Sequence, residues 1–264
     1  MMHFAPPRVR ILGADVDVVT PRDMLRLTEA LVDAGGPAVI ANHNAHSLVL
    51  ARRSAAMRAF YDDADLVQID STPMIMWARL LGLPVSADHR STYLDWRDDF
   101  WQLANDRGWR VFYLGGAPGV AQAAAGHLQP RWQNAVIGWH DGYFDARQGS
   151  ADNALVLKQI AAFQPDILFV GMGMPRQEEW IAAHRDSLDR GVIFSVGAAF
   201  DYEAGEQKAA PRWTGKVGLE WLFRLTTQPR RLAARYLIEP WALLPAAMAD
   251  VASALTHRGN RAAA

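Results

Sequence analysis

Short apolar runs alternate along the chain with longer segments whose apolar positions recur every three or four residues. The short runs predict strands, at residues 37–41, 65–69, 110–114, 135–138, 166–170 and 192–196. The longer segments predict helices, at residues 21–35, 45–62, 73–81, 91–106, 118–129, 151–163 and 176–187. Strands that alternate with helices are typical of βαβ units. The pattern therefore predicts an α/β fold with a mainly parallel sheet and flanking helices.

Both ends of the chain depart from this alternation. Apolar residues at 9–12 and 16–18, split by Gly13-Ala14-Asp15, predict a short hairpin. From 206 to 240 the chain has seven basic residues against three acidic ones, interleaved with tryptophans. We expect a core of residues 1–205 and a basic, Trp-rich helical appendage of residues 206–264.

Composition narrows the class of protein. The 264 residues suffice for one large domain with an appendage. The net charge of −1 argues against a nucleic-acid partner bound through bulk charge, and the lack of cysteine excludes disulfides and thiolate metal sites. No apolar stretch is long enough to predict a spanning helix, and the first ten residues do not resemble a signal peptide. We expect a globular, cytoplasmic protein.

Glycines follow two of the predicted strands. Gly115 and Gly116 come after the strand at 110–114, and Gly171 and Gly173 come after the strand at 166–170. Each pair is followed by a proline and a helix, so free N–H groups at these turns are suited to a phosphate. The dinucleotide fingerprint and the P-loop motif are both missing, which argues against a dinucleotide cofactor and a P-loop ATPase.

Asp70 follows the strand at 65–69. From position alone we favour a cap on the helix that begins near Pro73, and the alternative is a general base at the carboxyl edge of the sheet. Asn42 and Asn44 follow the strand at 37–41 and are expected in the same cleft.

Gln177, Glu178 and Glu179 occupy the first turn of a predicted helix. Acidic residues there stabilise the helix dipole, so the two carboxylates are expected to be structural. The amide of Gln177 is suited to hydrogen bonding with a sugar hydroxyl or a uracil edge. The scattered histidines form no set of three ligands, and no metal site is predicted.

Arg224, Arg231 and Arg235 are spaced by seven and four residues, which aligns them on one helical face. Pro229 interrupts this stretch and predicts two helices that meet at a corner. Further on, an apolar stripe suits either a membrane surface or a cap on the core; it contains Trp241, Leu243, Leu244, Met248, Val251 and Leu255.

Seven sequence blocks carry a family resemblance. They are A-D-L-V-Q-I-D-S-T-P-M (64–74), G-W-R-V-F-Y-L-G-G-A-P (108–118), G-W-H-D-G-Y-F (138–144), P-D-I-L-F-V-G-M-G-M-P-R-Q-E-E-W-I (165–181), V-G-A-A-F-D-Y-E-A-G (196–205), A-P-R-W-T-G-K-V-G-L-E-W-L-F-R-L (210–225) and P-R-R-L-A-A-R-Y-L (229–237). Over roughly residues 8–240 the chain resembles the WecG/TagA/CpsF family of bacterial glycosyltransferases.

The resemblance implies a Rossmann-like core and an appendage that contacts the inner face of the cell membrane. It also implies inverting transfer of a sugar from a UDP-sugar to a polyprenyl-pyrophosphate-linked sugar, with no metal or other cofactor. The family's base matches Asp70, its pocket glutamine Gln177 and a pocket arginine Arg90. Its pyrophosphate- or UDP-binding arginines match Arg224, Arg231 and, less securely aligned, Arg235. Further substrate-binding candidates in the matched regions are Asn42, Asn44, Gly115, Gly116, Tyr143, Gly171 and Gly173.

Four positions depart from the family pattern. These changes bear on the identity of the transferred sugar more than on the class of reaction. Asn42 stands where threonine is common, Ser71 and Tyr93 where glycine is usual, and Ala209 where arginine is common. Members use UDP-N-acetylmannosamine, its uronic acid, or UDP-glucose in exopolysaccharide synthesis, and the departures at Asn42 and Tyr93 favour a UDP-hexose without an N-acetyl group. A different nucleotide-sugar enzyme and a non-catalytic nucleotide- or lipid-binding module stay open as alternatives.

Overall fold

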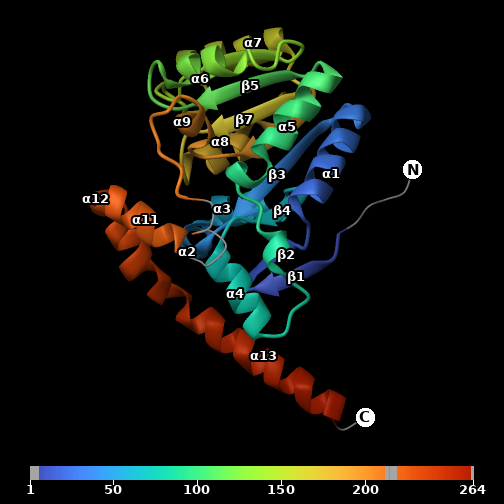
Figure 1. The fold of residues 1–264 in the computed structure, drawn as a ribbon, viewed down its shortest axis with the longest axis vertical. Helices are drawn as coiled ribbons and strands as arrows, with labels where there is room; N and C mark the ends of the chain where they lie inside the picture. The colour runs from blue at the N-terminus through green and yellow to red at the C-terminus, as the bar shows by residue number, and fades with distance from the viewer. Residues whose placement is uncertain (1–5, 212–213, 215–218, 263–264) are drawn as a thin grey trace.

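The computed structural model describes residues 6–211, 214 and 219–262, apart from the side chains of Arg231 and residues 257–262. Its centre is a sheet of six parallel strands in the order β4-β3-β8-β7-β5-β6 (Figure 1). The strands are β3 (Pro37–His43), β4 (Leu66–Ile69), β5 (Arg110–Gly115), β6 (Val136–His140), β7 (Ile167–Gly171) and β8 (Gly191–Ser195). The predicted α/β, Rossmann-like architecture is confirmed.

Two apolar layers sandwich the sheet, because successive strand residues point to opposite faces. In β7, Leu168 and Val170 enter one layer, while Ile167 and Phe169 enter the other. The first layer includes side chains of α2 (Ala45–Arg53), α3 (Ala55–Asp62), α4 (Thr72–Leu80), α7 (Ala151–Phe163) and α8 (Arg176–His184). The second includes those of α1 (Pro21–Ala34), α5 (Tyr93–Arg107), α6 (Val120–Leu128) and α9 (Ala199–Glu203). With both faces covered, the carboxyl edge of the sheet is the place for a ligand.

Local sequence signals set the ends of the N-terminal elements. Thr20 caps α1 through the N–H of Asp23, and Gly35 ends the helix with a φ of 79°. The predicted hairpin forms between β1 (Arg8–Ile11) and β2 (Ala14–Asp17), which are antiparallel. Its turn falls at Leu12 and Gly13, one residue earlier than predicted, and both have the positive φ that such a tight turn requires.

The described appendage is helical from Glu220 onward, as predicted, whereas its residues 206–211 form no helix. It comprises α11 (Glu220–Thr227), α12 (Pro229–Ala233), the π-helical turn η3 (Ala234–Ile238), the 3₁₀ turn η4 (Glu239–Leu243) and α13 (Leu244–Ala262). The predicted break occurs at Gln228, since the ring of Pro229 cannot continue a helix. From this corner α13 runs away beneath the core (Figure 1). No helix in the described part of the chain is long and apolar enough to cross a membrane.

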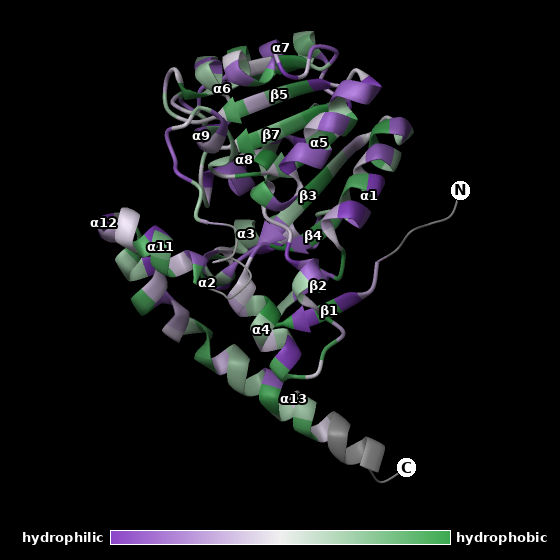
Figure 2. Ribbon diagram, in the orientation of Figure 1, coloured by the Kyte–Doolittle hydropathy of each residue, from purple (hydrophilic) through white to green (hydrophobic). Residues whose placement is uncertain are grey.

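The inner face of the C-terminal segment packs on the core. Leu243 and Ala246 are buried, and Asp250 Oδ2 accepts hydrogen bonds from the Leu12 N–H at 2.8 Å and from Trp77 Nε1 at 3.0 Å. The predicted apolar stripe is therefore divided, because only Leu243 joins the core. Its other members are exposed, namely Trp241, Leu244, Met248, Val251 and Leu255. Figure 2 shows apolar positions along much of the described part of α13.

Candidate active site

Two adjoining pockets lie along the carboxyl edge of the sheet. The larger, here called the core pocket, has a volume of about 500 Å³ and receives residues that end or follow all six strands. These are Asn42 and Asn44 from β3, Asp70 after β4, Gly116 and Ala117 after β5, Gly142 and Tyr143 after β6, Gly171–Met174 at the end of β7, and Val196–Ala198 after β8. All the strands are parallel, so their carboxyl ends meet at this edge.

The second pocket, here called the appendage pocket, has a volume of about 270 Å³ and lies between the core and the appendage. The core provides the beginnings of α2 and α4, and the appendage provides Glu220, Trp221, Arg224, Arg235, Tyr236 and Pro240. Six residues line both pockets: Asn44, Asp70, Thr92, Glu220, Arg224 and Arg235. The two pockets therefore meet around Asp70.

Asp70 does not cap the following helix, so the interpretation favoured from its position is wrong. Ser71 occupies the N-cap position of α4, while the Asp70 N–H donates to the carbonyl of His43 and holds the end of β4 beside β3. The Asp70 side chain instead lines both pockets. This placement makes the carboxylate available to a ligand.

Burial, reinforced by the negative charge of Glu220, raises the pKa of Asp70 to about 7. The positive charges of Arg224 and Arg90 oppose this shift. A carboxylate with a pKa near 7 is a stronger base than an ordinary aspartate and is still ionised in a large fraction of molecules at neutral pH. The electrostatics of the site therefore suit proton abstraction by Asp70.

Arg90 lies in the appendage pocket, but two carboxylates of the protein already engage its guanidinium. It donates to Asp95 at 2.8 Å within the core and to Glu220 at 2.8 Å in α11. Such charge-assisted pairs hold the partners in a fixed geometry. Arg90 thus connects the appendage to the wall of the pocket, a role that the sequence did not suggest.

Arg224 and Arg235 bring positive charge to the junction of the pockets from α11 and η3. The Nε atom of each is buried without a hydrogen-bond partner among the described residues, and Arg235 Nη2 lies 3.4 Å from Asn44 Oδ1. Burial, together with the charge of Arg224, lowers the pKa of Arg235. Buried guanidinium groups with unused donors are suited to an anionic ligand.

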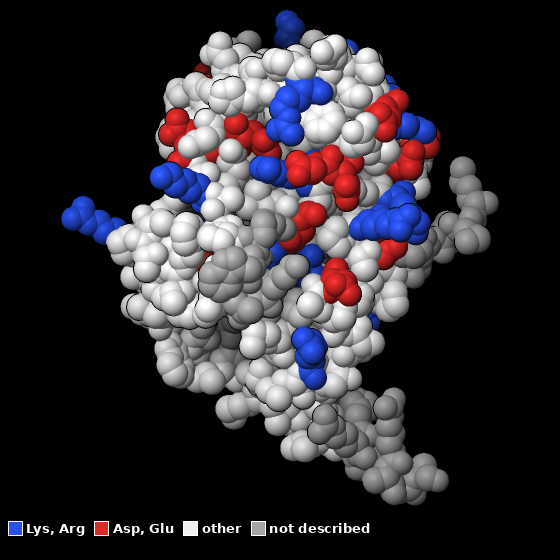
Figure 3. All heavy atoms as spheres, viewed as in Figure 1, with Lys and Arg blue, Asp and Glu red and all other residues white. Residues whose placement is uncertain are grey.

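Two of the basic side chains of the appendage, Arg224 and Arg235, therefore face the pockets. The described surface of the appendage in Figure 3 is largely uncharged, while charged groups gather over the core. The third predicted arginine, Arg231, has a side chain outside the described residues. A second link to the core joins Glu239 of η4 to His46 at the start of α2.

The four predicted glycines fall into two kinds. A Cβ on Gly115 would lie 2.3 Å from the carbonyl oxygen of Gly171, and one on Gly171 would lie 2.3 Å from that of Gly197. These two glycines are needed for backbone packing between strand ends. Gly116 and Gly173 both line the core pocket with positive φ, and Gly173 has open space where a Cβ would be. Gly173 thus has the close ligand access that the sequence suggested for all four.

The remaining predicted residues also line the core pocket, in different environments. Tyr143 is exposed, whereas Asn42 donates to the carbonyl of Ser195 at 2.6 Å. Gln177 is buried, and its Oε1 accepts from the Gly173 N–H at 3.1 Å. All three are placed to contact a ligand in this pocket.

One acidic residue of the site, Glu220, was missed in the sequence. Glu220 was counted only as a charge of the appendage, although its spacing of four residues from Arg224 places both on one helical face. Glu178, which was expected to be structural, is fully buried and lines neither pocket. No cluster of three or more His, Cys, Asp or Glu side chains able to hold a metal occurs in the part of the chain that the structure describes.

A parallel sheet with glycine turns at its carboxyl edge, where a basic carboxylate adjoins buried arginines whose Nε atoms lack a partner among the described residues, is typical of an enzyme that activates a hydroxyl group beside a phosphate-bearing ligand. Comparison with known sequences agrees with this class. Residues 9–256 match the glycosyl transferase WecG/TagA/CpsF family. The chain belongs to this family and is a glycosyltransferase.

Curated relatives occur in Staphylococcus aureus. The proteins of strains NCTC 8325 / PS 47, COL and MRSA252 are each 30% identical to this chain over 235 residues, covering 85% of this chain and 87% of the relative. Each is named N-acetylglucosaminyldiphosphoundecaprenol N-acetyl-β-D-mannosaminyltransferase. The family match, over residues 9–256, extends over the core and most of the appendage.

Proposed function

We propose that this enzyme transfers a hexose-type sugar from a UDP-sugar to a polyprenyl-diphosphate-linked saccharide during synthesis of a bacterial cell-surface polysaccharide. In the reaction, a hydroxyl oxygen of the acceptor sugar attacks the anomeric carbon of the donor. The bond from that carbon to the UDP oxygen breaks, and UDP leaves with the electron pair. Asp70 takes the proton of the hydroxyl. A single displacement of this kind inverts the anomeric configuration.

The observation that carries the proposal is the position of Asp70 on the shared wall of two pockets. A transferase must bring its donor and its acceptor together beside the general base. A carboxylate that lies between two cavities can contact both substrates. The raised pKa of Asp70, about 7, suits a base that works near neutral pH.

We assign the donor to the core pocket and the acceptor diphosphate to the appendage pocket. The turns at Gly116 and Gly173 and the first turn of α8 line the core pocket, and glycines without side chains let the UDP diphosphate approach the backbone closely. Arg224 and Arg235 line both pockets, so they are placed to bind the acceptor diphosphate and to stabilise the leaving UDP. This division leaves residues 1–205 as the donor-binding core and 206–264 as the acceptor-binding appendage.

The exposed apolar face of the C-terminal segment supports peripheral association with the cytoplasmic surface of the cell membrane, where a lipid-linked acceptor would be found. Trp241 and Met248 are 66% and 70% exposed, and apolar side chains of this kind insert into the boundary between headgroups and acyl chains. The inner face of α13, fixed by Asp250, keeps this surface attached to the core.

The two departures that favoured a donor without an N-acetyl group have structural partners. Asn42 donates to Ser195, and the Tyr93 hydroxyl donates to Glu203 and accepts from Trp101. These contacts weaken the inference about the donor, and the name of the relatives supports UDP-N-acetylmannosamine as the first donor to test, with UDP-glucose second. The same name supports N-acetylglucosamine on a polyprenyl diphosphate as the acceptor.

The test is a transfer assay with radiolabelled UDP-N-acetylmannosamine, its uronic acid and UDP-glucose, each offered with a short-chain prenyl-diphosphate-linked N-acetylglucosamine. We expect one donor to give a labelled lipid-linked disaccharide, with the inverted anomeric configuration by NMR. Binding of UDP without transfer from any donor to this acceptor would contradict the proposed reaction.

A further inference from the structure

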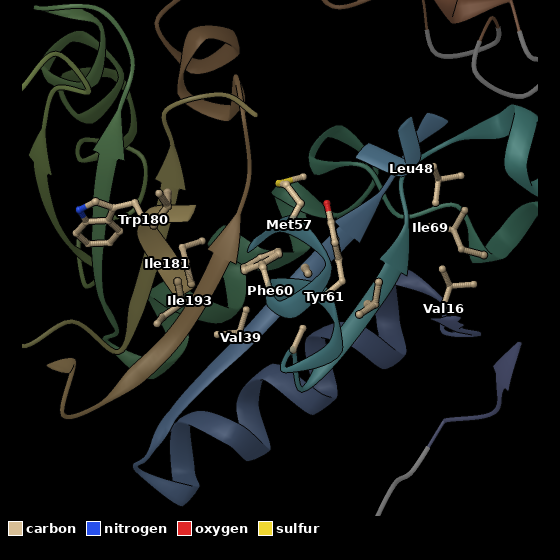
Figure 4. Packing of buried hydrophobic residues seen from close by; sticks show 14 of the residues in the cluster. Val16, Val39, Leu48, Met57, Phe60, Tyr61, Ile69, Trp180, Ile181 and Ile193 are labelled. Carbon is tan, nitrogen blue, oxygen red and sulfur yellow. The ribbon is translucent and has the colours of Figure 1, made fainter. Parts of the chain in front are cut away.

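Glu178 is a buried acid for which the proposed reaction provides no role. It lies in the first turn of α8 and has no solvent exposure. The apolar cluster around this part of α8 joins Trp180 and Ile181 to Met57 and Phe60 of α3 (Figure 4). Such a location is unfavourable for a carboxylate, because burial removes the water that solvates its charge.

The hydrogen bonding of Glu178 is incomplete. Its Oε1 accepts from Gln177 Nε2 at 2.7 Å, whereas its Oε2 is buried without a hydrogen-bond partner among the described residues. Burial raises the pKa of Glu178 to about 7. A buried acid with an unsatisfied oxygen lowers stability relative to an apolar side chain of similar size, so stability does not account for this residue.

The contact with Gln177 has a geometric consequence. Gln177 Oε1 accepts from the Gly173 N–H at 3.1 Å, and the Gln177 N–H donates to the Gly173 carbonyl at 3.0 Å. A flipped amide would place Nε2 against the Gly173 N–H and Oε1 against the Glu178 oxygen, which are a donor–donor and an acceptor–acceptor contact. The Gly173 N–H and an ionised Glu178 carboxylate therefore both favour the same orientation of the Gln177 amide.

The fixed orientation concerns the core pocket directly, because Gln177 and Gly173 both line it. The amide of Gln177 has a second Nε2 hydrogen and a second Oε1 lone pair for a ligand. Gly173 has a φ of 80°, and its turn is held by both hydrogen bonds to Gln177. A rotating amide would disturb the ligand contacts and the turn together.

We infer that Glu178 is a positioning residue of the donor pocket, which acts through Gln177 to fix the amide and the Gly173 turn. The inference rests on the proposed function, since it assigns the UDP-sugar to this pocket. It also implies that the protein retains Glu178 at some expense of stability. Replacing Glu178 with an apolar residue is then expected to weaken ligand binding while the stability of the fold stays the same or rises.

The test compares Glu178→Leu, which removes the acceptor, with Glu178→Gln, whose amide oxygen can still accept from Gln177. Affinity is measured by calorimetry with UDP, UDP-N-acetylmannosamine and UDP-glucose, and stability by thermal unfolding. We expect Glu178→Leu to weaken binding of at least one of these ligands about tenfold while the Tm stays the same or rises. Glu178→Gln is expected to bind within about twofold of the wild type.

A double-mutant cycle with Gln177→Ala separates positioning from general packing. If Glu178 acts through Gln177, adding Glu178→Leu to Gln177→Ala causes no further loss of affinity. Additive losses, or a fall in Tm for both Glu178→Leu and Glu178→Met, would overturn the inference. Wild-type protein that binds none of the three ligands would refute the proposed function itself, whereas wild-type binding with an additive cycle would refute only the role of Glu178.

Discussion

Arg90 in the core donates to Glu220 in the appendage at a distance of 2.8 Å, beside the carboxylate of Asp70 in the same pocket. The pair joins two segments that are 130 residues apart in the chain. Through it, the appendage contributes both a wall of the pocket and a negative charge that raises the pKa of Asp70. The proposed base is therefore adjusted by residues from both parts of the protein.

Replacing Asp70 with Asn is expected to lower the transfer rate by at least about 100-fold, because an amide cannot accept the acceptor proton. In the wild type, kcat/KM is expected to rise as the pH increases through about 7, since the base acts in its deprotonated form and its pKa is raised to about 7. The measurement is a pH–rate profile, with Asp62→Asn on the exposed end of α3 as the control. An acidic limb that persists in the residual activity of Asp70→Asn would assign the titration to another group.

Replacing Glu220 with Gln is expected to move the acidic limb to lower pH. The charge of Glu220 raises the pKa of Asp70, so its removal favours ionised Asp70; a shift of about half a unit to one unit is reasonable for a nearby charge. The amide can still accept from Arg90, which preserves the contact between appendage and core. Glu206→Gln, an exposed change in the appendage, is the control. An unchanged limb would mean that Glu220 does not act on the titrating group.

Replacing Arg224 or Arg235 with Ala is expected to raise the KM for the lipid-linked acceptor. Hydrogen bonds to charged groups contribute about 1.5–3 kcal/mol, which corresponds to about a tenfold to hundredfold effect. The matched control is Arg230→Ala, an exposed arginine of α12 that does not line either pocket. Equal effects of Arg224→Ala and Arg230→Ala would point to general charge attraction rather than a diphosphate site.

Replacing Leu244 and Met248 together with Ser is expected to weaken binding to anionic liposomes while UDP binding is unchanged. These side chains are 48% and 70% exposed on α13, so their loss removes apolar surface without opening the core. Leu155→Ser on α7, where Leu155 is 66% exposed, is the control for a generic loss of surface apolarity. Vesicle sedimentation gives the result, and undiminished binding by the double variant would exclude this face as the membrane contact. Deletion of residues 241–264 is a less selective test, because it also removes the buried Leu243 and Ala246.

Transfer is expected to continue in EDTA at an undiminished rate. The two Asp-x-Asp pairs of the sequence, Asp15/Asp17 and Asp63/Asp65, line neither pocket. Arg224 and Arg235, whose Nε atoms have no hydrogen-bond partner among the described residues, can neutralise a diphosphate instead. Rates are compared before and after chelation and after addition of Mg²⁺ or Mn²⁺. Activity that disappears in EDTA and returns with either ion would contradict metal independence.

The sequence by itself determined the order and type of the core elements. Strand periodicity and helix signals such as the Thr20 cap act between residues close in the chain, so they can be recognised without tertiary structure. The break at Pro229 has the same local origin. Asp70 and Gln177 were identified as candidates because they follow strand ends or match a family block, and both line the core pocket.

Only the tertiary structure decided what these residues contact. Asp70 faces a cavity because α4 begins one residue later, with Ser71 as its N-cap. The Arg90–Glu220 pair depends on how α11 packs against the core. Glu178 has an ordinary position for a first-turn acid, but α8 directs it inward, where it contacts Gln177. Burial and charge pairing arise from segments distant in sequence, because a side chain's environment is formed by whichever elements fold around it. The local sequence pattern does not identify those distant neighbours. The pKa of Asp70 is nevertheless set by them, through burial and through the charges of Glu220, Arg224 and Arg90.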